Sequence, residues 1–142
     1  MRNVENKTTP VICFVANFKY LYKNFPRIYQ QLRVKGNYKD EIIVITSLTC
    51  PSFLVKYMNK KNNITILRFK RIKFDELTDR SFANLKVNVN RHKTKNFQWH
   101  KLYLFHSKLK KWPYIFYMDI NMNIHHDVNN LLKETPNNNL LA

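Results

Sequence analysis

The sequence predicts an α/β fold in which short helices alternate with the strands of a mostly parallel sheet. Four apolar segments, at 11–16, 41–46, 64–69 and 114–118, have the length and the β-branched or aromatic content of strands. Helical spacing of apolar residues appears between them, at 18–34, 51–60 and 97–109. Because this alternation builds parallel sheets with crossover helices, we expect one α/β domain over residues 1–142.

The first half of the chain carries clear stop and start signals. The apolar strand at 11–16 is stopped by Asn17, and Pro26 suits the first turn of the main helix within 18–34. Gly36 follows the end of that helix, where glycine is common. The polar residues 1–9 are expected to be flexible.

The second half of the chain predicts secondary structure clearly in some segments and weakly in others. Residues 74–95 indicate only a loose helix or covering loop, whereas 97–109 predicts a helix. Pro113 precedes the strand at 114–118, whose continuous apolar character predicts a central, buried position beside the strand at 11–16. A short helix capped by Asp127 is expected after it.

Composition excludes several classes of protein. Hydrophobic residues make up 44% of the chain, which is typical of a globular protein. There is no apolar run of the roughly 18 residues that a membrane span needs, and the polar N-terminus does not resemble a signal peptide. Cys13 and Cys50 are expected to be reduced thiols, so we expect a cytoplasmic protein.

The net charge of +16 raises the alternative of a small basic RNA-binding protein without catalysis. Its densest basic cluster is Arg68-x-Lys70-Arg71-x-Lys73, and Tyr20 and Tyr22 are candidate stacking residues. The basic residues are otherwise scattered, and a solvated strand edge explains the cluster more simply. Nucleic acid is therefore a possible but less favoured partner.

A single glycine restricts how a nucleotide can be bound. Gly36 alone cannot supply a P-loop or a Gly-x-Gly-x-x-Gly turn, both of which need several glycines near the phosphates. A bound nucleotide would have to be held by side chains and a metal ion.

Asp119 and Asn121 follow the predicted strand at 114–118, and ligands of open α/β sheets gather at the carboxyl ends of strands. Two hard oxygen donors spaced in this way suit Mn²⁺ or Mg²⁺ shared with a diphosphate. The alternative is that both residues only form the turn. His125 and His126 do not indicate zinc, because adjacent extended residues face opposite ways and no further ligand lies at suitable spacing.

The segment Tyr114-Ile-Phe-Tyr-Met-Asp-Ile-Asn121, together with the helix before it, resembles GT-A glycosyltransferases. The similarity is greatest to glycogenin-like and related viral or microbial nucleotide-diphospho-sugar transferases, including giant-virus types. It rests on Lys101-Leu102, Asp119-x-Asn121 and Asp127-Val128, and Asn121 replaces the commoner second aspartate.

This resemblance implies a Rossmann-like domain that binds a nucleotide-diphosphate sugar and transfers the sugar to an unknown acceptor. It assigns Asp119 and Asn121 to the metal, Lys101 and Arg91 to the donor diphosphate, and Ala16, Asn17 and Tyr20 to the nucleotide base. The catalytic residue stays unknown. Because GT-A domains extend further past this motif, the chain is expected to be truncated after Asp-x-Asn and to bind donor better than it transfers sugar.

Overall fold

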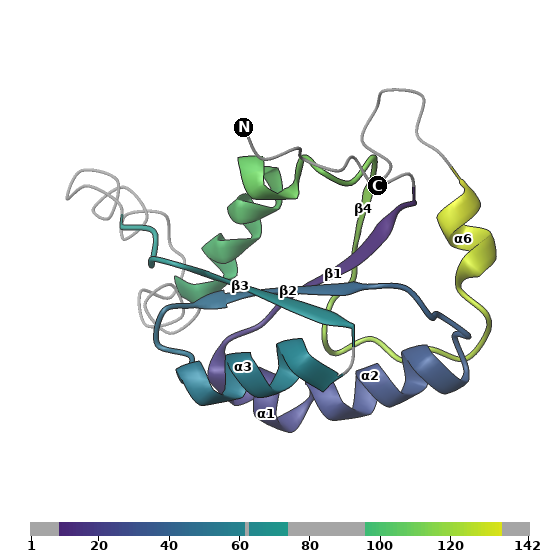
Figure 1. Cartoon of the computed structure of the whole chain (residues 1–142), viewed down its shortest axis with the longest axis horizontal. Coiled ribbons are helices and arrows are strands. Elements are labelled where there is room, and N and C mark those ends of the chain that lie inside the picture. The colour runs from purple at the N-terminus through teal and green to yellow at the C-terminus, as the bar shows by residue number, and fades with distance from the viewer. Residues whose placement is uncertain (1–8, 62, 74–95, 135–142) are drawn as a thin grey trace, which may run out of the picture.

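The computed structural model describes residues 9–61, 63–73 and 96–134 (Figure 1). The described elements follow one another as β1 Val11–Val15, α1 Phe18–Lys23, α2 Phe25–Val34, β2 Ile42–Ser47, α3 Ser52–Lys61, β3 Ile64–Phe69, η1 Asn96–Phe105, η2 Ser107–Leu109, β4 Ile115–Tyr117 and α6 Asn129–Lys133. The elements written η are 3₁₀ helices. The predictions for 74–95 and for Arg91 lie outside the described residues.

The four described strands form one parallel sheet in the order β3-β2-β1-β4. Ile12 pairs with Ile42 of β2 on one side and with Phe116 of β4 on the other. The predicted α/β class and parallel sheet are therefore confirmed, and the arrangement is compatible with a Rossmann-like fold.

The fourth strand is not central among the described residues, so that prediction is wrong. Within the described strands β4 pairs only with β1. Ile115 and Phe116 are half-buried, and Tyr117 is exposed. The continuous apolar run has another cause. Ile115 packs against the core on one face of the sheet and Phe116 against the core on the other. Because both faces of β4 are covered, the strand is apolar throughout although it is not central. The predicted pairing with the first strand is confirmed.

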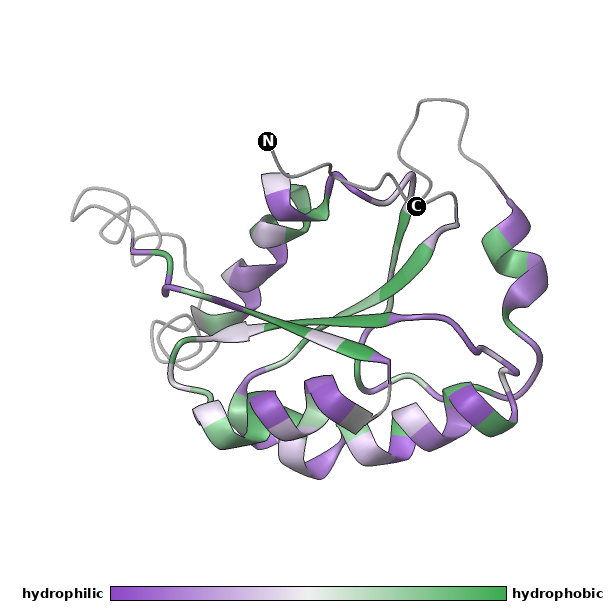
Figure 2. Cartoon of the chain, in the orientation of Figure 1, coloured by the Kyte–Doolittle hydropathy of each residue, from purple (hydrophilic) through white to green (hydrophobic). Residues whose placement is uncertain are grey.

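Two hydrophobic layers enclose the sheet. Helices α1, α2 and α3 lie along one face and η1 lies along the other (Figure 1). Alternate residues of β1 face the two sides, with Ile12 and Phe14 in the first core and Val11 and Cys13 in the second. Figure 2 shows these strands as hydrophobic ribbons between helices with many hydrophilic residues.

The predicted helix over 97–109 is present, but it is wound as 3₁₀ helix rather than α-helix. Aromatic and imidazole rings occur every third residue, at Phe97, His100, Tyr103 and His106. A 3₁₀ helix has three residues per turn, so the rings of Phe97, His100 and Tyr103 lie in one column, and His106 follows directly after η1. Adjacent centroids are 4.3, 5.4 and 6.2 Å apart, and Phe69 of β3 stacks on Tyr103 at 4.2 Å.

The expected helix over 18–34 is divided at Asn24 into α1 and α2, with Pro26 in the first turn of α2 as predicted. Gly36 is buried just past α2, where a Cβ atom would lie 2.7 Å from the Leu32 carbonyl oxygen. Glycine is therefore required by this close approach. Within the described ranges, every helix is too short or too polar to cross a bilayer.

Candidate functional site

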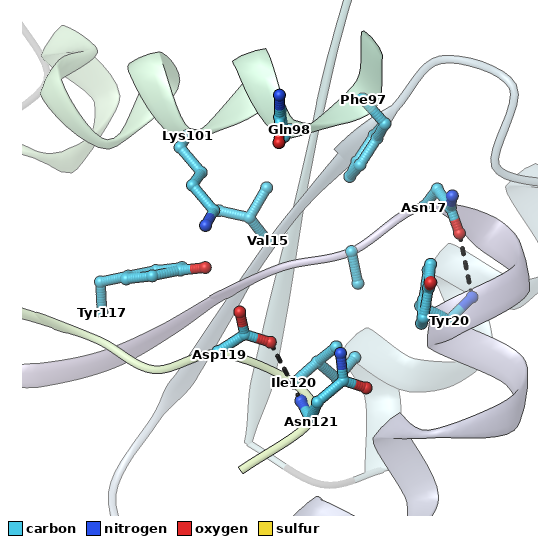
Figure 3. A pocket seen from close by; sticks show the side chains of 11 residues that line it. Val15, Asn17, Tyr20, Phe97, Gln98, Lys101, Tyr117, Asp119, Ile120 and Asn121 are labelled. Atoms are coloured by element: carbon cyan, nitrogen blue, oxygen red, sulfur yellow. Dashed lines mark hydrogen bonds between the residues drawn. The ribbon is translucent and has the colours of Figure 1, made fainter. Parts of the chain in front are cut away.

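The strand order reverses between β1 and β4. From β1 the chain proceeds outward to β2 and β3, then returns to place β4 on the other side of β1. A crevice at such a switch point, outside the carboxyl ends of the strands, is the usual ligand site of open α/β sheets. A pocket of about 240 Å³ lies there (Figure 3). It is lined by Val15, Ala16, Asn17, Tyr20, Phe97, Gln98, Lys101, Tyr117, Asp119, Ile120 and Asn121.

The β1 side of the pocket is formed by Ala16, Asn17 and Tyr20. Ala16 is buried and donates its N–H to the Ile45 carbonyl, which fixes the end of the strand. Asn17 caps α1, because its Oδ1 accepts the Tyr20 N–H at 2.9 Å. The Tyr20 side chain is 42% exposed and lines the pocket, so it is not a core residue.

The β4 side is a tight turn that begins at Asp119. One carboxylate oxygen of Asp119 accepts the Asn121 N–H at 3.1 Å, and the Asp119 carbonyl accepts the Met122 N–H at 3.1 Å. The other carboxylate oxygen is directed towards the pocket (Figure 3). Asp119 therefore forms the turn, which was the alternative considered from the sequence, and it also presents an anionic oxygen to the pocket.

The chemistry of these donors fits a hard divalent cation. Asp119 offers one carboxylate oxygen, while the Asn121 Oδ1 accepts a hydrogen bond from Asn24 Nδ2 at 3.1 Å and keeps a second lone pair. Oxygen donors of this kind suit Mn²⁺ or Mg²⁺. The part of the chain that the structure describes holds no cluster of three or more His, Cys, Asp or Glu side chains suited to a metal. An ion here would need further oxygens from a ligand or water.

Helix η1 supplies the third side of the pocket. Lys101 lies opposite Asp119, with its Nζ 5.1 Å from the centroid of the Tyr117 ring (Figure 3). Gln98 and Phe97 also line the pocket, and neither was predicted from the sequence. The signal for Gln98 was its position three residues before Lys101, since residues three apart share one side of a 3₁₀ helix.

Two other groups considered in the sequence lie elsewhere. His125 and His126 are exposed and do not line the pocket. Arg68, the first residue of the basic cluster, donates to the Cys50 carbonyl at 3.1 Å and to Ser52 Oγ at 3.2 Å. This side chain therefore makes structural contacts within the domain.

No family model and no curated protein matches this chain. The pocket is therefore the feature of this chain from which a function can be inferred. It brings together the described residues for which the family resemblance implied roles at the metal, diphosphate and base, namely Ala16, Asn17, Tyr20, Lys101, Asp119 and Asn121. Of the predicted site residues, Arg91 alone lies outside the described ranges.

Proposed function

We propose that this pocket binds a nucleotide-diphosphate sugar with Mn²⁺ or Mg²⁺, and that the domain is a metal-dependent glycosyltransferase. The carboxylate of Asp119, the amine of Lys101 and the ring of Tyr20 line one pocket at the strand switch point, and this observation carries the proposal. Among the described residues β4 lies at the edge of the sheet, so the central strand that the sequence predicted before Asp119 does not support this function.

Each side of the pocket has a role in the proposal. Tyr20 stacks on the nucleobase, because an exposed aromatic ring presents its face to any base. Asp119 and Asn121 hold the divalent cation, which when bound neutralises charge on the diphosphate. Lys101 adds a fixed positive charge beside the same phosphates, where negative charge grows as the bond between the sugar and the diphosphate breaks.

A thermal-shift screen of uridine and guanosine diphosphate sugars, each with and without Mn²⁺, tests the proposal. We expect a higher melting temperature only when Mn²⁺ and a sugar nucleotide are both present. A ligand at 100 times its Kd stabilises the native state by about 2.7 kcal/mol. A shift with single-stranded RNA and none with any sugar nucleotide would instead favour the RNA-binding alternative.

Lys101→Met is expected to weaken sugar-nucleotide binding about tenfold, or about 1.4 kcal/mol, because it removes a cation beside the phosphates. Lys108→Met is a matched control. Both amines lie over a ring, at 5.1 Å from the Tyr117 centroid and 5.6 Å from the Phe69 centroid, but Lys108 does not line the pocket. Calorimetric titration of both variants checks the prediction. Equal losses in the two would show that general surface charge is responsible.

A further inference from the structure

Three polar side chains beside α2 face the segment that follows Asp119. They are Asn24, which precedes the helix, and Arg27 and Gln31 within it. Spacings of three and four residues place side chains on one face of a helix. No sequence pattern marked these residues, since nothing in the α2 region indicated which segment would lie beside it.

Each of the three contacts the chain just after β4. Asn24 Nδ2 donates to Asn121 Oδ1 at 3.1 Å, and Gln31 Oε1 accepts the Ile124 N–H at 3.0 Å. Arg27 lies between them and makes the most contacts. Its Nη1 donates to the Met122 carbonyl at 3.2 Å and to Asn123 Oδ1, and its Nη2 reaches the Ile120 carbonyl at 3.4 Å.

The apolar contacts of this segment leave the turn itself to be held by polar groups. Ile120 and Ile124 are each 4% exposed and pack into the core on the α2 side of the sheet. Between them, Asn121, Met122 and Asn123 are exposed. A guanidinium has a rigid fork of donors, so one arginine can hold several carbonyl oxygens in a fixed arrangement.

We propose that Arg27, assisted by Asn24 and Gln31, is the positioning residue of this site: it fixes the turn that carries Asp119 and Asn121 at the pocket. Its effect on ligand binding rests on the proposed function. The ordering of the turn does not, because these contacts exist in the protein alone.

Hydrogen exchange of the free protein tests the positioning role directly. In Arg27→Leu we expect the amides of Asn121, Met122 and Ile124 to exchange about tenfold faster, since local opening of the turn becomes easier. Arg33→Leu is the matched control. Arg33 lies on the same helix and donates to the carbonyls of Tyr38 at 2.8 Å and Asp40 at 2.7 Å, away from the pocket. It is expected to leave those three amides unchanged.

Binding separates positioning from general stability. Arg27→Leu is expected to weaken Mn²⁺-dependent binding of a uridine or guanosine diphosphate sugar about tenfold, as loss of outer contacts to metal ligands does. Binding of the matching nucleoside without metal should change less than about twofold, because Tyr20 and Asn17 are untouched. Arg27→Lys should fall between parent and Arg27→Leu, since lysine keeps the charge without the fork.

Parent-like exchange at these amides in Arg27→Leu would overturn the proposal, as would equal acceleration in Arg33→Leu. If Arg27→Leu does not fold, Arg27→Lys decides the question by the same exchange measurement, and parent-like exchange there overturns it. Absence of any Mn²⁺-dependent binding in the parent chain would overturn the proposed function, while the exchange data would still decide the positioning role.

Discussion

Replacing Asp119 with alanine is expected to abolish the Mn²⁺-dependent part of sugar-nucleotide binding. Asp119 is the only anionic residue among the described residues that line the pocket. Hydrogen bonds to ionised acceptors are about twice as strong as those to neutral ones, and the preference of a cation for an anionic oxygen has the same electrostatic origin. We expect the Kd measured by calorimetry with Mn²⁺ to rise about 100-fold, or about 2.7 kcal/mol, and to equal the value without metal.

Two further variants make this result specific. Asn121→Ala should weaken binding less, about tenfold, because it removes a neutral oxygen ligand that already accepts a hydrogen bond from Asn24. Asp40→Ala removes an exposed carboxylate that does not line the pocket, so it should bind as the parent does. Parent-like, Mn²⁺-dependent binding by Asp119→Ala would show that the metal site is assigned to the wrong residues.

Mild acid is expected to destabilise the domain through His100. This side chain is 1% exposed, and within the described ranges neither ring nitrogen has a hydrogen-bond partner of suitable geometry. Burial lowers the pKa of His100, the nearby Arg71 lowers it further, and the backbone groups of Phe69 and Phe97 oppose this only in part. The ring of Phe97 stacks on His100 and the ring of Tyr103 meets it edge-on, so a charged imidazole would be poorly solvated there.

The sign of the pH effect follows from the lowered pKa. Below about pH 6.5 the unfolded chain binds a proton at this residue that the folded chain excludes. Stability is therefore complete above that pH and falls as the pH drops towards the folded pKa, by at most about 1.4 kcal/mol per pH unit. Urea unfolding between pH 7.5 and 5 measures this slope.

His100→Phe should remove this contribution, because phenylalanine keeps a ring in the column without a titrating group. His125→Phe is the control, since His125 is exposed and its replacement should leave the slope as in the parent. An unchanged slope in His100→Phe would show that other groups are responsible. Because Gln98 and Lys101 lie on the same helix and line the pocket, ligand binding should weaken over the same pH range.

The sequence by itself predicted the strands, and through a family resemblance it named six of the residues that line the pocket. Continuous apolar runs such as Val11–Val15 are typical of strands that are buried on both faces of a sheet. Polar residues that interrupt such runs, as Asn17 and Asp119 do, must then lie at strand ends. Carboxyl ends of neighbouring parallel strands meet at one edge, so the predicted pairing of the strands at 11–16 and 114–118 placed these two residues together. The near absence of glycine likewise excluded phosphate loops.

The tertiary structure decided what depends on contacts between distant segments. An apolar run looks the same in a central and an edge strand when both faces are covered, so the position of β4 in the sheet could not be predicted from the sequence. That Tyr20 is exposed and lines the pocket was likewise visible only in the structure. Arg27 contacts Met122, 95 residues away in the chain, and a surface arginine carries no local sign of its partner. Local patterns specify which residues are buried, whereas long-range packing specifies which polar groups meet.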